Sequence, residues 1–146
     1  MTGQEDAAPP AGGGWERMKQ GSFETLAGPM FRTTQDLGPD EPLRIGFRVL
    51  PAHCNFGGTC HGGMIATFLD MALGLSIHTA TAAGGPTMSM TIDFLSPGLA
   101  GDWIESRARF VHATYRTGYC DVIAMGPRGP VARGNGIWRL IRPKEG

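Results

Sequence analysis

One long apolar helix constrains this 146-residue chain more than any other feature of its sequence. Helical periodicity runs from about Gly62 to Ala80, and no second long helix is indicated. Residues 43–50 alternate in the manner of a strand, and four more strand candidates follow the helix, separated by Gly and Pro turns: 88–94, 104–110, 119–125 and 130–141. Because such strands and a lone apolar helix bury their apolar faces together, we expect an α+β fold, with an antiparallel β-sheet wrapped around one long central α-helix.

Length and composition indicate one domain with an N-terminal extension. Residues 1–14 are rich in Ala, Pro and Gly, and we expect a flexible tail there. Residues 15–42 form a helical or looped lead-in, in which Trp15 to Gln20 begins a short helix, and residues 43–142 form the folded domain. The 13 basic and 13 acidic residues cancel, so charge does not favour a nucleic-acid partner.

The cysteines and the N-terminal residues indicate the cellular compartment in which the protein is expected. An odd set of three cysteines without two-residue spacing favours reduced thiols and a cytoplasmic setting. No basic segment followed by an apolar run opens the sequence, so we expect no signal peptide. The most apolar stretch, residues 64–80, is interrupted by polar residues that include Thr67, Asp70, Ser76 and His78, and we expect no membrane span or membrane partner.

The predicted helix has two different faces. At 100° per residue, one broad face is apolar and consists of Ile65, Phe68, Leu69, Ala72 and Leu75. Another side gathers small residues around a single carboxylate, and it consists of Gly63, Thr67, Asp70 and Gly74. Small residues let a ligand or another backbone approach the helix closely on that side.

Asp70 is the unusual member of this second side. Aspartate is unfavourable in the middle of a helix, and no basic residue lies within one turn of Asp70. An unpaired carboxylate buried there would be costly. Two interpretations follow: a solvent-facing Asp on an amphipathic helix, or a carboxylate that faces a ligand cleft.

The start of the helix can bind developing negative charge. His61-Gly62-Gly63 places two glycines at the first turn, where backbone N–H groups have no helical acceptor and the helix dipole adds positive potential. Gly62 and Asp70 are eight residues apart, which is roughly 12 Å of helical rise. That distance is too long for both to act on one atom within one chain. A site shared between two subunits would bring an amide from one helix to the acid of the other.

The spacing Asn55-x5-His61-Gly62-Gly63-x6-Asp70 resembles that of the hotdog-fold thioesterases, particularly the phenylacetic-acid-pathway (PaaI-like) branch and the branch of human thioesterase superfamily member 2. The segment from Thr87 to Pro97, followed by Gly101, is similar to the strand after the family's central helix. Residues 107–125 and 131–140 resemble its last strands. The resemblance extends from about Leu43 to Leu140.

This resemblance implies a hotdog fold, a homodimer that often assembles into a homotetramer, and active sites at the subunit interface. The implied reaction is hydrolysis of acyl-coenzyme A (acyl-CoA) thioesters to a free acid and coenzyme A (CoA), without a metal or a separate cofactor. Asp70 would act as nucleophile or as general base on water. The Gly62 N–H would polarise the carbonyl, Asn55 would orient water or carbonyl, His61 would hold the loop, and Thr87 would help position water.

Substrate binding is expected to use Gly63 and cationic residues at the mouth of the site, because CoA carries phosphates. Arg116 lies in the turn that often meets the nucleotide in relatives, and Arg109 and Arg133 are further candidates. Each is otherwise an ordinary surface arginine. Met64, Met88 and Met90 are candidates for an adaptable acyl pocket, or for plain core packing.

Other interpretations compete at several positions. Zinc held by His53, Cys54, Cys60 and His61 has non-standard spacing, and a Cys60–His61 nucleophilic pair joins adjacent rather than separated residues. Asn55 also suits the turn geometry of an Asn-x-Gly loop. A non-catalytic acyl-CoA binding protein on the same fold is the main functional alternative. A hotdog dehydratase is less favoured, since the required Asp–His or His–Glu pattern is missing.

Overall fold

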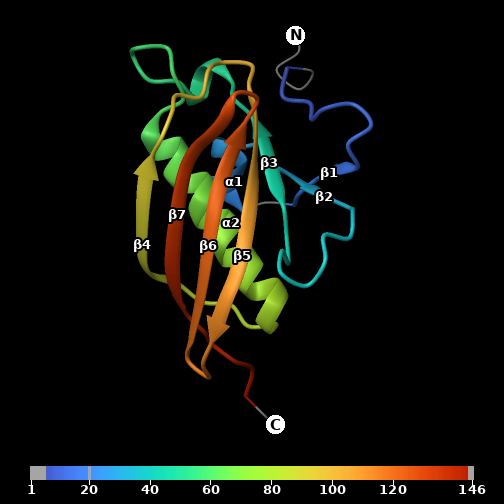
Figure 1. Cartoon of the computed structure of the whole chain (residues 1–146), viewed down its shortest axis with the longest axis vertical. Helices are drawn as coiled ribbons and strands as arrows, with labels where there is room; N and C mark the ends of the chain where they lie inside the picture. Colours follow the sequence, from blue (N-terminus) through green and yellow to red (C-terminus); the bar gives the residue numbers. More distant parts are fainter. Residues whose placement is uncertain (1–5, 20, 145–146) are drawn as a thin grey trace.

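The computed structural model describes residues 6–19 and 21–144. A seven-stranded antiparallel sheet, in the order β1-β2-β3-β5-β6-β7-β4, packs on one long helix, α2 (Gly62–Thr81) (Figure 1). The predicted α+β arrangement is therefore confirmed. The strands are β1 (Trp15–Arg17), β2 (Phe31–Thr33), β3 (Ile45–Arg48), β4 (Thr87–Phe94), β5 (Trp103–Ala113), β6 (Thr117–Gly126) and β7 (Gly129–Arg139).

The five strands and the helix expected from periodicity are all present, with ends shifted by a few residues. Strands β5, β6 and β7 form a continuous meander, and β4 joins the far side of β7 after the chain has crossed the sheet along α2. Strand β4 is thus an edge of the sheet with one side unpaired. Met88 and Phe94 on this strand are each 59% exposed, so its apolar residues do not belong to the core of the single chain.

The lead-in differs from the expectation. Trp15–Arg17 is a strand and not the start of a helix, because it pairs with β2 and Trp15 packs edge-on against Trp103 with ring centroids 5.1 Å apart. The short helix of this region, α1 (Ser22–Ala27), lies further along the chain.

Part of the expected tail packs on the domain. Ala7 is buried, and the guanidinium of Arg48 donates two hydrogen bonds to the Ala8 carbonyl oxygen, at 3.1 and 2.8 Å. The backbone carbonyl of Gly14 accepts from the Thr34 N–H. Residues 6–14 thus contact the domain at Ala7, Ala8 and Gly14 but are otherwise largely exposed, and residues 1–5 of the expected tail lie outside the described residues.

Helix α2 forms the centre of the core. Its sheet-facing side is fully buried, and the Phe68 ring meets Phe47 of β3 at 4.9 Å between centroids. Each such buried side chain stabilises the fold by about 1.5–3 kcal/mol. Leu75, expected on the buried face, is only half-buried. By length and composition α2 could cross a membrane, which corrects the expectation that no stretch is apolar enough; its burial by the sheet is that of a core helix.

Candidate functional site

Asp70 has a partner that its own helix does not supply. The Thr87 hydroxyl donates to Asp70 Oδ1 at 2.6 Å, and Thr87 is the first residue of β4. The segment Gly84-Gly85-Pro86 carries the chain from the end of α2 to that strand. The carboxylate is half-buried, and its second oxygen has no acceptor or donor partner in the described chain. Asp70 is therefore oriented by a neutral donor rather than neutralised by a cation.

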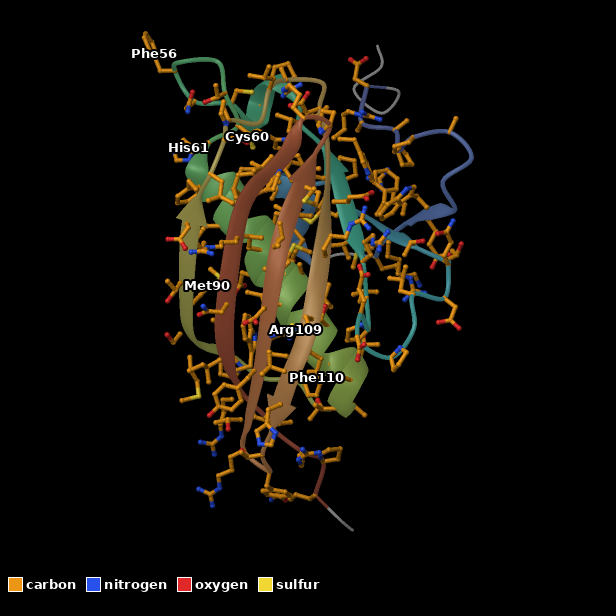
Figure 2. The ribbon with its side chains drawn as sticks, viewed as in Figure 1. Phe56, Cys60, His61, Met90, Arg109 and Phe110 are labelled. Atoms are coloured by element: carbon orange, nitrogen blue, oxygen red, sulfur yellow. The ribbon has the colours of Figure 1, made fainter. Side chains whose placement is uncertain are left out.

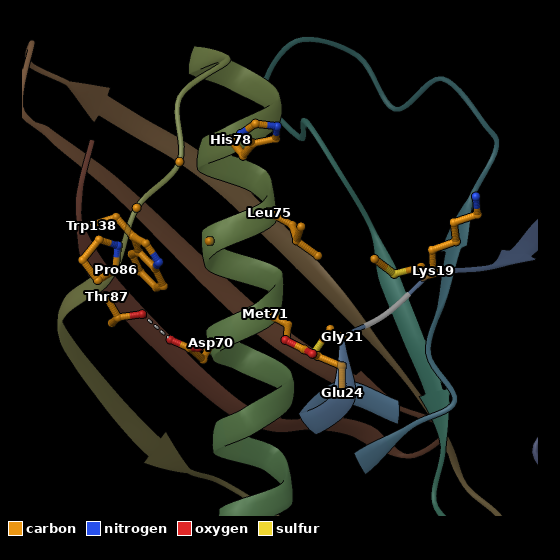
Figure 3. A pocket seen from close by; sticks show the side chains of 14 residues that line it. Lys19, Gly21, Glu24, Asp70, Met71, Leu75, His78, Pro86, Thr87 and Trp138 are labelled. Carbon is orange, nitrogen blue, oxygen red and sulfur yellow. Dashed lines mark hydrogen bonds between the residues drawn. The ribbon is translucent and has the colours of Figure 1, made fainter. Parts of the chain in front are cut away.

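A cavity of about 500 Å³ opens beside this pair (Figure 3). Thr87 and Trp138 lie on one side of α2, and Lys19 and Glu24 lie on the other. The cavity wall consists of Met18, Lys19, Gly21, Glu24, Asp70, Met71, Gly74, Leu75, His78, Gly84, Gly85, Pro86, Thr87 and Trp138. Of the methionines expected to line an acyl pocket, Met64, Met88 and Met90 are absent from this wall; Met18 and Met71 line it instead.

Trp138 is a residue of this cavity that sequence reasoning did not assign to the site. It pairs with Thr87 across strands β7 and β4, so both side chains point toward α2. Its indole reaches the bare backbone of Gly74, where an added Cβ would lie 2.9 Å from the indole nitrogen. A tryptophan in a strand indicates only core packing, and nothing local to the sequence marks it as part of a cavity.

The start of α2 is organised by His61. The His61 Nδ1 accepts from the Gly63 N–H at 2.8 Å, and the His61 carbonyl oxygen accepts from Met64 and Ile65. The Gly62 N–H is left with no acceptor in the described part of the chain. Of the two glycines, Gly62 therefore offers a free donor, whereas the N–H of Gly63 is already used.

Asn55 closes the glycine loop before the helix. Its side chain accepts from the Thr59 N–H at 3.1 Å and donates to the Thr59 hydroxyl at 3.0 Å. These bonds match the turn-forming interpretation of Asn55. The same amide is exposed and retains a further donor hydrogen for an external acceptor.

A single chain does not bring these residues to Asp70. His61 and Gly63 line a separate depression with Phe23 and Leu26, and Gly62 lines another beside Phe94. Phe56, Cys60 and His61 lie together at one end of the molecule (Figure 2). None of the expected residues Asn55, His61, Gly62 and Gly63 lines the cavity at Asp70; Thr87 does.

The three candidate arginines fall in two places. Arg109 and Arg133 lie on the sheet face turned away from α2, in ion pairs with Asp121 at 3.3 Å and Asp93 at 2.9 Å, and they line a different cleft of about 550 Å³. Arg116 lies in the turn between β5 and β6 and is exposed, with no side-chain partner among the described residues.

The structure disfavours both the zinc site and the Cys60–His61 nucleophilic pair. His53 is buried, its Nε2 lies 2.6 Å from the Ala27 carbonyl oxygen and its Nδ1 accepts from the Leu50 N–H, so neither ring nitrogen is free for a metal. Desolvation lowers the pKa of His53. Burial raises the pKa of the Cys60 thiol to about 12, which keeps it protonated and unsuited to act as a nucleophile.

The sequence is similar to those of known thioesterases and esterases. A model of the thioesterase superfamily matches residues 57–129, half of the chain. PA0474 of Pseudomonas aeruginosa, an esterase by name, is 30% identical over 117 residues, covering 79% of this chain and 85% of that protein. The acyl-coenzyme A thioesterase PaaI of Escherichia coli is 34% identical over 64 residues, covering 44% of this chain and 45% of that protein.

Solved structures show the same fold. The E. coli PaaI structure aligns with a TM-score of 0.67 at 24% identity, covering 75% of this chain and 82% of PaaI. A hypothetical thioesterase of Streptococcus pneumoniae, crystallised with coenzyme A, aligns with a TM-score of 0.67 at 22% identity, covering 73% of this chain and 86% of its own.

Proposed function

The chain belongs to the thioesterase superfamily as a hotdog-fold thioester hydrolase of the PaaI type, and from this premise we propose that it hydrolyses acyl-CoA thioesters to a free acid and CoA. The observation that carries the proposal is the Thr87–Asp70 hydrogen bond at the wall of a 500 Å³ cavity. A carboxylate held by one neutral donor keeps its second oxygen for a water molecule or a carbonyl carbon. The names of PaaI and of the CoA-bound S. pneumoniae protein support CoA as the thiol portion of the substrate.

In this proposal Asp70 performs the attack in one of two ways. As general base it takes a proton from water, and the resulting hydroxide adds to the thioester carbonyl. As nucleophile it adds to the carbonyl itself and forms an anhydride that water then opens. In both routes the C–S bond breaks and CoA leaves as a thiolate; overall, water supplies the hydroxyl of the free acid and the proton that converts the thiolate to the thiol. Thr87 holds the carboxylate in position for either route, and no cofactor beyond the substrate's own CoA is needed.

The carbonyl oxygen needs a donor that the same chain does not bring to Asp70. We assign this role to the Gly62 N–H of the partner subunit in a homodimer, with Asn55 and His61 of the partner subunit beside it. Three observations support the assignment: the Gly62 N–H has no acceptor in the described part of its own chain, Gly62 lines a different cavity from Asp70, and the unpaired β4 edge exposes Met88 and Phe94. A homotetramer would be built from two such dimers.

For the CoA phosphates we favour Arg116 among the three arginines. Its guanidinium has no partner among residues 6–19 and 21–144, whereas Arg109 and Arg133 would have to leave their ion pairs with Asp121 and Asp93. The three thiols are free in the structure, which suits the reducing cytoplasm that we propose as the compartment.

A hydrolysis panel of short, medium, long and aryl acyl-CoAs tests this function by following thiol release. Turnover by the wild-type protein that is lost in Asp70→Asn supports the thioesterase. Binding of acyl-CoA without turnover would instead support the second candidate, a non-catalytic acyl-CoA binding protein, which the same cavity could serve. Unchanged turnover in Asp70→Asn would contradict the assigned mechanism.

A further inference from the structure

The side chain of Trp138 is buried, and its indole N–H opens on the cavity without an acceptor among the described residues. Trp138 is 4% exposed, lines the cavity at Asp70, and makes no hydrogen bond to any residue in the described ranges 6–19 and 21–144. By contrast, Trp103 donates its indole N–H to Glu105 at 3.2 Å. Because this nitrogen is accessible from the cavity, water can bind it there, and a ligand that displaces this water has to supply an acceptor or lose the hydrogen bond.

Two glycines make room for this indole. A Cβ at Gly74 of α2 would lie 2.9 Å from the indole nitrogen, and a Cβ at Gly136 of β7 would lie 2.1 Å from the ring carbon Cζ3. Any side chain at Gly74 would cover the N–H and fill the part of the cavity beside it. The local sequence therefore keeps the donor uncovered next to Asp70 and Thr87.

Gly74, the residue that faces the indole nitrogen, lies about one helical turn from Asp70 along α2. Gly74 follows Asp70 by four residues, a rise of about 6 Å along α2, and Trp138 faces Thr87 across the β7–β4 pair. A few carbon–carbon bonds cover that rise. An acyl group whose carbonyl lies at Asp70 and whose chain runs along α2 would bring its third or fourth carbon to the indole N–H.

We propose that Trp138 is a specificity-determining residue that donates its indole N–H to an oxygen atom on the acyl group. The enzyme then selects acyl-CoAs that carry a hydroxyl, oxo or ether oxygen on or next to the third or fourth carbon. An acyl group without that oxygen would displace water from the indole N–H and leave the donor unpaired, and sites built around a hydrogen bond reject such analogues strongly. This inference rests on the proposed hydrolysis of acyl-CoA.

Isosteric substrate pairs test the proposal by comparing kcat/KM with oxygen or carbon at the same position. One pair is 3-hydroxybutanoyl-CoA and 3-methylbutanoyl-CoA; the other is 4-methoxybutanoyl-CoA and hexanoyl-CoA. The wild-type protein should prefer the oxygen member of at least one pair by about tenfold or more. Trp138→Phe, which keeps an aromatic ring but removes the N–H, should bring that ratio close to one. Trp103→Phe, which removes an indole outside the cavity, should leave the ratio unchanged.

A second variant covers the case in which Trp138→Phe does not fold. Gly74→Ala places a methyl group against the indole nitrogen and should reduce the same ratio, with folding checked by the thermal unfolding midpoint. If the oxygen preference is absent from the wild-type protein, or if it persists in folded Trp138→Phe or Gly74→Ala, the assignment of Trp138 is wrong.

A binding measurement separates this inference from the proposed function. In Asp70→Asn labelled with ¹⁵N, the Trp138 indole resonance is identified by its loss in Asp70→Asn/Trp138→Phe. It should move downfield in the proton dimension with 3-hydroxybutanoyl-CoA or 4-methoxybutanoyl-CoA and less with the carbon isostere. Equal movement with both members of each pair would overturn the role of Trp138. Binding of this kind without wild-type turnover would leave Trp138 as a recognition residue and reject the hydrolase.

Discussion

The hydroxyl of Thr87, at the start of strand β4, donates to the carboxylate of Asp70, in the middle of helix α2, across 2.6 Å. This bond joins the free edge of the sheet to the central helix at the wall of the 500 Å³ cavity. It orients Asp70 without introducing a positive charge, so the carboxylate remains free to react.

Replacement of Asp70 by Asn should lower kcat for acyl-CoA hydrolysis by at least about 100-fold, because general-base or nucleophilic catalysis contributes that much or more. The amide can still accept from Thr87, so the thermal unfolding midpoint should change little. Asp36→Asn is a matched control, since the Asp36 carboxylate accepts only from a loop N–H of Gly38. A comparable loss of activity in both variants would argue against a specific role for Asp70.

Replacement of Thr87 by Val keeps the shape of the side chain but removes the donor. We expect kcat to fall by about 10- to 100-fold, the range that corresponds to a hydrogen bond to a charged group. Thr87→Ser restores the hydroxyl and should recover most of the activity. Failure of Ser to exceed Val in a steady-state assay would show that the hydroxyl does not position Asp70.

A mixture of two inactive variants tests whether two chains share each site. Gly62→Pro removes the proposed carbonyl donor at the first helical position, which proline tolerates, and His61 already has the extended backbone (φ −61°, ψ 137°) that precedes a proline. In a heterodimer with Asp70→Asn, one of the two sites would combine an intact Asp70 with an intact Gly62.

Random reassociation of equal amounts makes half of the dimers mixed, so about a quarter of wild-type activity should return on mixing. The two variants assayed separately provide the baseline. Activity that does not rise above that baseline, although mass spectrometry detects mixed dimers, would place Asp70 and Gly62 in separate functions.

The thiols should differ sharply in reactivity. Burial raises the pKa of Cys60 and of Cys120 to about 12, so at pH 8 only roughly one part in ten thousand of each is thiolate. In the native protein iodoacetamide should modify the half-buried Cys54 first, and all three thiols should react in denaturant. Peptide mass spectrometry checks the order. Cys60→Ser should keep its activity; loss of activity in a folded Cys60→Ser would revive the nucleophilic interpretation.

Acid should destabilise the fold through His53. Desolvation lowers the pKa of His53 in the folded protein below the unfolded value of about 6.5. The unfolded chain therefore takes up the proton first, so the contribution of His53 to stability is complete above pH 6.5 and declines as pH falls toward the folded-state pKa. Thermal unfolding midpoints between pH 8 and pH 5 should fall more steeply for the wild-type protein than for His53→Gln. Identical slopes would assign the acid sensitivity to other groups.

Periodicity predicted α2 and the long strands because each places apolar residues on one face over many residues. It missed β1 and β2, which have three residues each, and the pairing of Trp15 with Trp103 that selects strand over helix is a contact between distant segments. For the site, helical geometry grouped Asp70 with Gly74 and separated Asp70 from Gly62. The indole N–H of Trp138 faces the cavity because of the register of β7 against β4 and the space above Gly74. Neither of these can be predicted from a local sequence pattern.

The order of elements along the chain has a consequence for biosynthesis. Helix α2 ends at Thr81, whereas β7, the last of the strands that cover it, ends at Arg139. At translation rates of 5–20 residues per second, the interval between them is roughly 3 to 12 seconds. During that time the ribosome presents a 20-residue helix that is apolar enough to enter a bilayer but still lacks its sheet. The apolar face of α2 therefore stays uncovered until the last strand of the sheet has been synthesised.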